Sequence, residues 1–198
     1  MRQARILLWA LVALAIAGAV LLILRAGPAL TPQDSSPTQA SFGGPFTLIG
    51  GNGKPFSSQA LEGKPYAIYF GFTRCGDVCP TTLSRLAKLR REAGGEQAFH
   101  IVFVTIDPAY DGPKQVGQYA QLFGSPIIGL TGSQAQIDQV KKQYGIFAQP
   151  TPHAAMGKEM EHTATVLLFD RSGKFVATVT PDEADSSALA KLKSLVSA

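Results

Sequence analysis

The residues with the clearest capacity for chemistry are two cysteines four positions apart, Cys75 and Cys79, in a chain of 198 residues. Two sulfurs at this spacing, with Gly76 between them, can approach closely enough to form a disulfide or to bind one metal ion. Pro80 suits the first turn of a helix, and this places Cys79 near a helix N-terminus, where free N–H groups and the helix dipole favour a thiolate. A thiolate is both the nucleophile of disulfide exchange and a soft ligand that selects Cu(I). The pair alone leaves both functions open.

A purely structural disulfide is the weaker interpretation of this pair. Closing so short a loop would stabilise the protein by only about 2 kcal/mol. A bridge meant for stability would join segments that are distant in the sequence, and Cys75 and Cys79 are near neighbours.

The chain has three histidines, His100, His153 and His162. We predict a structural role for His100, because it begins an apolar strand. His162 comes just before a predicted strand, 163–169, which should run beside a buried strand, 66–72, so its ring can face the cysteine loop. One imidazole with two thiolates suits Cu(I) and can also hold Cu(II), whereas zinc would require a fourth ligand.

The elements that must position these residues are predicted from apolar runs and turn signals. Strands and helices alternate in the order β-β-β-α-β-α-β-α-β-β-α, which implies an α/β fold with a mixed sheet and helices on both faces. Ligands of such sheets bind outside the carboxyl ends of the strands, so the loop 73–80 is the expected site. The predicted strands are 46–49, 55–56, 66–72, 99–106, 127–130, 163–169 and 175–180; the predicted helices are 81–93, 113–123, one opened by a capping box at Ser133 and Gln136, and 186–197.

The N-terminal segment carries a long apolar run. The 19 residues from Ile6 to Leu24 contain no charge, proline or amide, close to the ~20 that cross a bilayer as a helix. A cleaved signal peptide is the alternative, but its apolar region is normally ~7–15 residues long and a cleavage site should follow it directly. Because Arg25 ends the run, an uncleaved anchor is favoured. Arg2 and Arg5 predict that the leading tail stays in the cytoplasm and that the remainder is exported.

The sequence therefore predicts three parts: a transmembrane anchor (1–25), a flexible tether rich in proline, serine and threonine (26–41), and one folded domain (42–198). The net charge of +4 comes mostly from the three arginines that flank the apolar run, so the folded part is nearly neutral. This distribution gives no basic patch for nucleic acid. The composition, 45% hydrophobic and 16% charged residues, excludes a disordered tail.

Four motifs occur in order along the chain: FGFTRCGDVCP at 70–80, TIDP at 105–108, GLTG at 129–132 and His162. Together they resemble the SCO/SenC family of membrane-anchored copper proteins, over about residues 46–175. The resemblance implies a thioredoxin-like fold with an N-terminal β-hairpin extension, preceded by one transmembrane helix. It also implies that one copper ion, as Cu(I) or Cu(II), is bound by Cys75, Cys79 and His162.

The function implied by the resemblance is that of a non-catalytic metallochaperone. It would help to assemble the binuclear copper site of cytochrome c oxidase subunit II, as a single-pass inner-membrane protein whose soluble domain lies on the periplasmic side. Another exported copper carrier is a further candidate partner. The alternative is a membrane-anchored thiol–disulfide oxidoreductase that reduces the copper-ligand cysteines of the partner, with Cys75 and Cys79 as its redox disulfide. A peroxidase is disfavoured, because Gly76 stands where peroxiredoxins need threonine.

Two positions depart from the family pattern. Gly76 stands where many relatives have proline, which should loosen the loop, and Glu161 replaces the aspartate usual before the histidine. Glu161 keeps a carboxylate that can orient a ligand from outside the metal site. We predict the same supporting role for Asp77 and Asp107, although an aspartate before a proline also commonly starts a turn.

The loop 150–161 holds both methionines other than Met1, namely Met156 and Met160, together with His153. A thioether is a soft ligand for Cu(I). We therefore expect this loop to offer transient contacts to copper during transfer; the simpler interpretation is a solvent-exposed loop that happens to contain these residues.

Overall fold

The computed structural model describes residues 3, 9, 14–21, 42–151 and 160–197. The chain divides into two compact units, 1–39 and 40–198. In the first unit residues 14–21 are helical. Within the described ranges, no helix combines the length and apolar character that a membrane crossing requires. The predicted tether lies outside the described residues and the predicted anchor mostly does, so both stay predictions.

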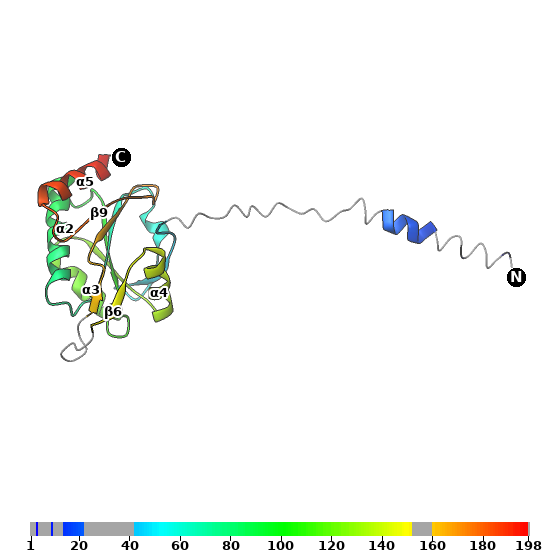
Figure 1. Ribbon diagram of the computed structural model, residues 1–198, viewed down its shortest axis with the longest axis horizontal. Coiled ribbons are helices and arrows are strands. Elements are labelled where there is room, and N and C mark those ends of the chain that lie inside the picture. Colours follow the sequence, from blue (N-terminus) through cyan, green and yellow to red (C-terminus); the bar gives the residue numbers. More distant parts are fainter. Residues whose placement is uncertain (1–2, 4–8, 10–13, 22–41, 152–159, 198) are drawn as a thin grey trace. The chain divides into compact units, whose positions relative to one another are not determined.

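The second unit is built on a seven-stranded mixed sheet with the strand order β2-β1-β5-β4-β3-β8-β9 (Figure 1). Strands β3, β4 and β5 are parallel, whereas β8 runs antiparallel to β3. The seven strands are β1 (Thr47–Gly50), β2 (Pro55–Ser57), β3 (Tyr66–Gly71), β4 (His100–Thr105), β5 (Ile127–Thr131), β8 (Val166–Phe169) and β9 (Phe175–Val179).

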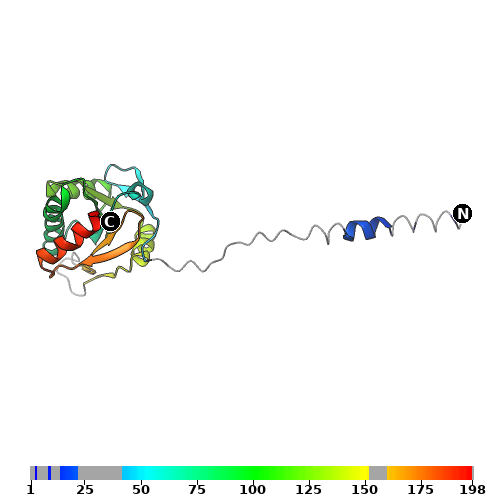
Figure 2. The same cartoon turned by 90° about the horizontal axis from the view of Figure 1, so that it is seen from above.

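Helices cover both faces of the sheet, as predicted. In Figures 1 and 2, α2, α3 and α5 lie on one side of the sheet and α4 lies on the other. The predicted capping box opens α4, with the Ser133 hydroxyl accepting from the Gln136 N–H. The helices are α2 (Val78–Gly94), α3 (Pro113–Ala120), α4 (Gln134–Gln143) and α5 (Asp185–Ser197), with short 3-10 turns η1 (Ser58–Leu61) and η2 (Gln121–Phe123).

Strand β3 lies inside the sheet, between β4 and β8, and is buried at all six positions. Its continuous apolar run fits a strand covered on both faces. Because β3 and β4 are in parallel register, Gly71 pairs with Thr105 and the loops that follow both strands emerge at one edge. Because β8 is antiparallel to β3, the residues that precede Val166 arrive at that same edge. The topology therefore brings His162 toward the cysteine loop.

A second, two-stranded sheet was missed by the sequence analysis. It pairs β6 (Ala148–Pro150) with β7 (Met160–His162), and Ala148 lies opposite His162. The sequence predicted a loop here, and a strand from residue 163 that instead begins at Val166. Strands of three residues are too short for an alternating pattern to reveal them.

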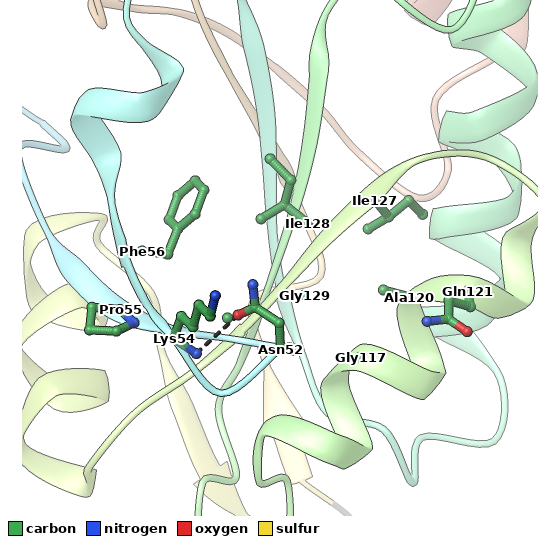
Figure 3. A pocket seen from close by; sticks show the side chains of 12 residues that line it. Asn52, Lys54, Pro55, Phe56, Gly117, Ala120, Gln121, Ile127, Ile128 and Gly129 are labelled. Atoms are coloured by element: carbon green, nitrogen blue, oxygen red, sulfur yellow. Dashed lines mark hydrogen bonds between the residues drawn. The ribbon is translucent and has the colours of Figure 1, made fainter.

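The predicted hairpin of β1 and β2 packs against α3 through glycines. A β-carbon on Gly51 would lie 2.5 Å from the Gly117 Cα atom, so only glycine permits this approach. The hairpin, α3 and β5 line a cavity of about 490 Å³ (Figure 3). Its polar groups include the exposed Asn52 and Lys54, and the Asn52 side chain accepts a hydrogen bond from the Lys54 N–H. This cavity contains neither cysteine nor histidine.

Candidate metal centre

The cysteine loop leads directly from β3 into α2. The helix begins at Val78, three residues earlier than predicted, and Pro80 lies in its first turn. Cys79 is therefore part of the helix, whereas Cys75 precedes it. The backbone N–H of Cys79 donates to the Cys75 Sγ atom at 3.4 Å. A free N–H group at the start of α2 thus faces the sulfur of Cys75.

Cys79 is enclosed on every side and has no solvent-exposed surface. The Tyr69 hydroxyl donates a hydrogen bond to its Sγ atom at 3.4 Å. A β-carbon on Gly71 would come within 2.8 Å of the same Sγ atom, so the absence of a side chain at Gly71 makes room for the sulfur. Cys75 is partly exposed. The two sulfurs therefore differ in access: one is held inside the protein and the other faces outward.

The ring of His162 reaches this pair from the two-stranded sheet. Its Nε2 atom lies 3.6 Å from the Cys79 Sγ atom. Its Nδ1 atom lies 3.1 Å from the Thr163 carbonyl oxygen, which can accept only if Nδ1 carries the proton, and the lone pair of Nε2 is then directed toward the sulfur. The edges of Tyr69 and Phe72 hold the ring, with centroid separations of 6.3 and 5.9 Å.

The two thiols have opposite proton affinities. Hydrogen bonding to Cys79 lowers the pKa of Cys75 to about 4, against an opposing contribution from burial and with further help from His162. The pKa of Cys79 is raised, first by the hydrogen bond with Cys75 and then by burial. A thiolate at Cys79 was expected from the helix N-terminus. In the structure the Cys79 N–H instead donates to the Cys75 sulfur, and the hydrogen bond between the two sulfurs, followed by burial, raises the pKa of Cys79. The thiolate is therefore favoured at Cys75.

The donor set consists of two sulfurs and one imidazole nitrogen. Soft sulfur ligands with an imidazole suit copper. In the described part of the chain, no three His, Cys, Asp or Glu side chains are already arranged as a metal cluster. Of the two sulfurs, Cys79 is fully buried and Cys75 is partly exposed.

The residues of this site lie within the part of the chain that is similar to known proteins. A family model described as SCO1/SenC matches residues 34–197. The chain belongs to the SCO1/SenC family. Among its relatives, the yeast (Saccharomyces cerevisiae) mitochondrial SCO2 protein is 34% identical over 163 residues, which are 80% of this chain and 54% of the yeast protein. A putative copper-binding protein of Stutzerimonas stutzeri is 33% identical over 64% of this chain and 63% of its own length.

Solved structures of SCO1/SenC relatives have the same fold. Bradyrhizobium japonicum ScoI with copper bound is similar at a TM-score of 0.70 and 35% identity, over 78% of this chain and 99% of that one. Yeast Sco1 with copper bound is similar at a TM-score of 0.70 and 30% identity, over 80% of this chain and 90% of that one. The predicted α/β Sco fold is confirmed. This chain spans about half of the yeast SCO2 protein.

The glycine that departs from the SCO1/SenC pattern is not required by packing. A β-carbon on Gly76 would find nothing within 4 Å. The position is open, so a larger residue can be accommodated and the loop is not held by side-chain contacts at this point.

The three predicted supporting carboxylates lie close to the cysteine loop but do not bond to either sulfur through their side chains in the described part of the protein. Asp77 is the N-cap residue of α2; its carboxylate accepts no N–H of the helix but accepts from the Thr81 hydroxyl at 3.5 Å, and its backbone helps to lower the pKa of Cys75. Asp107 pairs with Arg74 at 2.5 Å, and its carbonyl oxygen accepts from the Asp111 N–H in a turn. Glu161 is exposed and bonds with Gln149 on the neighbouring strand.

A buried aspartate that the sequence analysis missed holds the loop in place. Asp111 has no exposed surface. Its carboxylate accepts from the backbone N–H and the hydroxyl of Thr73, and from the Thr105 hydroxyl at 2.6 Å. Its carbonyl oxygen accepts from the Thr131 hydroxyl at 2.6 Å. One residue thus connects the ends of β3, β4 and β5. The only available signal was an Asp-Gly-Pro turn before α3, which does not indicate burial.

The methionine loop is described only in part. Met160, Cys75 and Phe72 share a cavity of about 430 Å³ at the cysteine loop. His153 and Met156 lie outside the described residues, so their transient contacts with copper stay a prediction. His100 begins β4, opposite Tyr66 at the amino end of the parallel strands. Burial lowers its pKa, in keeping with the structural role predicted for it.

Proposed function

We propose that this protein binds one copper ion through Cys75, Cys79 and His162. The observation that carries the proposal is the 3.6 Å approach of the His162 Nε2 atom to the Cys79 Sγ atom, beside the sulfur of Cys75, which accepts a hydrogen bond from the Cys79 N–H. The copper-bound structures of Bradyrhizobium japonicum ScoI and yeast Sco1 support it. The site supplies three soft or borderline donors, and it leaves one of them, Cys75, open to solvent.

The bound copper is cargo in this proposal. The proposed donor of the copper is another exported copper carrier. The protein then delivers the ion to the binuclear site of cytochrome c oxidase subunit II. Transfer by ligand exchange requires an accessible donor, and the partly exposed Cys75 meets this requirement. The protein performs this role anchored in the inner membrane by residues 1–25, with its N-terminus in the cytoplasm and its folded domain on the periplasmic side.

A thiol–disulfide oxidoreductase is the second candidate function. It is favoured by the low pKa of Cys75, about 4, in a partly exposed sulfur next to a buried one. In that reaction the Cys75 thiolate would attack the disulfide of the partner and displace one partner thiolate. Cys79 would then lose its proton and displace the second, which leaves a Cys75–Cys79 disulfide and a reduced partner.

One titration separates the two functions. The reduced protein is titrated anaerobically with Cu(I) against a competing chelator, as wild type and as Cys75→Ser, Cys79→Ser and His162→Ala. Copper binding predicts one equivalent for wild type and a loss of at least tenfold in affinity for His162→Ala. His100→Ala is the matched control, because this histidine lies at the amino end of β4, whereas the cysteine loop follows the carboxyl end of the neighbouring β3.

The same variants are then tested for reduction of a disulfide peptide. A reductase retains most of its exchange rate in His162→Ala, because only the sulfurs take part in electron transfer. Tight copper binding in wild type together with full affinity in His162→Ala would reject the proposed ligand set. Failure of wild type to bind copper would reject the chaperone function.

A further inference from the structure

The hydroxyl of Tyr69 is placed against one of the two sulfurs. Tyr69 lies on β3, is completely buried and pairs with Phe103 on β4, so the sheet fixes its position. Its hydroxyl donates to the Cys79 Sγ atom at 3.4 Å. Cys79 is also completely buried. A hydrogen bond between two enclosed groups is not weakened by competing water.

The fold does not need this hydroxyl. The neighbours of Tyr69 along β3, Ile68 and Phe70, are buried and apolar, and a phenylalanine ring would fill the same space as the ring of Tyr69. A tyrosine hydroxyl is protonated at neutral pH, so it is always available as a donor. The hydroxyl therefore bonds to groups of α2, namely the Cys79 sulfur and the Thr82 side chain, and is not needed to fill the space within the sheet.

A second buried tyrosine offers the contrast. Tyr119 on α3 is 8% exposed, and its hydroxyl is buried without a hydrogen-bond partner among the described residues. Its ring packs on Phe103 at 5.1 Å, the same residue that pairs with Tyr69. The two tyrosines thus share a neighbour and a buried setting, but only Tyr69 bonds to a sulfur.

We propose that Tyr69 is a positioning residue whose hydrogen bond to the Cys79 sulfur favours Cu(I) over Cu(II) in the bound ion. The inference rests on the proposed function, in which Cys79 is a copper ligand. A hydrogen bond to a coordinated thiolate withdraws electron density from the sulfur. Cu(II) depends more than Cu(I) on electron donation by sulfur, and hydrogen bonds around the sulfur are an established means of tuning a copper potential.

The step whose potential Tyr69 would change is the one-electron reduction of the bound copper. Bound Cu(II) gains one electron and becomes Cu(I), while both sulfurs remain thiolates and no proton moves. In the test the electron comes from an electrode through a soluble mediator. Tyr69 takes no part as an electron carrier; it changes only the relative stability of the two copper states.

The test compares wild type with Tyr69→Phe and with the control Tyr119→Phe. Each variant removes one buried hydroxyl and keeps the ring. Three properties are measured: the Cu(II)/Cu(I) potential, the sulfur-to-Cu(II) charge-transfer absorption, and the thermal unfolding of the copper-free protein. In Tyr69→Phe we expect the ratio of Cu(I) to Cu(II) affinity to fall by about tenfold, which equals a potential lower by about 59 mV for one electron. The charge-transfer band should also change wavelength.

The control separates tuning from a general effect of removing a hydroxyl. Tyr119→Phe should keep the potential and the absorption band of wild type, and it should unfold at the same or a higher temperature, because it removes an unpaired buried hydroxyl. A copper-loaded Tyr69→Phe with the potential and spectrum of wild type would overturn the inference while leaving the proposed function intact. Equal shifts in both variants would also overturn it. If wild type itself binds no copper, the proposed function fails, and the inference falls with it.

Discussion

The backbone of Gly71 and the sulfur of Cys79 are in such close contact that a β-carbon on Gly71 would lie 2.8 Å from the Sγ atom. The same β-carbon would approach Phe103 to 3.2 Å. Neither neighbour has room to move, since both are completely buried. The end of β3 therefore helps to determine where the sulfur lies.

This contact makes Gly71→Ala a test of the site geometry. The added methyl group must displace the Cys79 sulfur or the strand, and we expect the free energy of unfolding to fall by about 1–3 kcal/mol, as for other overpacked cores. Cu(I) affinity, measured by chelator competition, should fall by at least tenfold. Gly76→Ala is the matched control, because its β-carbon meets nothing within 4 Å. Equal affinities in the two variants would show that the position of the sulfur does not depend on Gly71.

Asp111→Asn tests the connection between the three strand ends. An asparagine keeps the size of the side chain but removes the charge that strengthens the hydrogen bonds from Thr73 and Thr105. We expect a loss of about 2 kcal/mol in unfolding free energy and a lower affinity for Cu(I), because Thr73 begins the cysteine loop. Urea denaturation and chelator competition measure the two effects. The control is Asp138→Asn, which removes the charge from an ion pair with Lys141 and weakens a surface hydrogen bond from Gln134, and it should change stability by less than about 1 kcal/mol.

The pH dependence of alkylation tests whether the thiols of Cys75 and Cys79 differ in pKa and in access to solvent. Because the pKa of Cys75 is lowered to about 4, Cys75 is already a thiolate at neutral pH. Its rate constant with iodoacetamide should therefore change by less than about twofold between pH 6 and pH 9. Mass spectrometry locates the label, and Cys79 should be labelled only after denaturation, because it is fully buried. A rate that falls about tenfold per pH unit below pH 8 would show an ordinary thiol at Cys75.

Met160→Leu tests whether a thioether contacts copper in transit. Leucine has a similar volume, so stability should change by less than about 1.5 kcal/mol. Met160 shares a cavity with Cys75, and we expect slower transfer of Cu(I) to a chelator with unchanged equilibrium affinity. Stopped-flow absorbance measures the rate. Wild-type rates for this variant and for the double variant Met156→Leu/Met160→Leu would exclude a role for the methionines.

Most of the fold followed from local signals in the sequence. The apolar run of β3, the capping box at Ser133 and the hairpin turn after β8 are local signals, and each was read correctly. The pairing of the strand that follows His162 with the buried strand β3 then brought His162 to the cysteine loop, in the prediction as in the structure. The sheet of β6 and β7 was missed because each of its strands has three residues.

The finer properties of the site depend on burial, which the sequence does not reveal. Cys79 was expected to be the thiolate because it stands at a helix N-terminus, but enclosure by Tyr69 and Gly71 excludes water from its sulfur. The carboxylate of Asp111 was missed for the same reason. An aspartate is usually exposed. The burial of Asp111 becomes evident only in the folded protein, where the ends of β3, β4 and β5 meet around it.

The histidine is carried by a ribbon separate from the sheet that holds the sulfurs. Cys79 is fixed between β3 and α2, whereas His162 lies on β7, which pairs only with β6 within the described residues. Fraying two strands of three residues would withdraw the imidazole and expose only the edge of the hydrophobic core against which Ala148 and Met160 pack. Amide protons of the β6–β7 ribbon should thus exchange with deuterium well before those of β3. The lifetime of the three-donor arrangement would then be set by the opening of this ribbon and not by global unfolding.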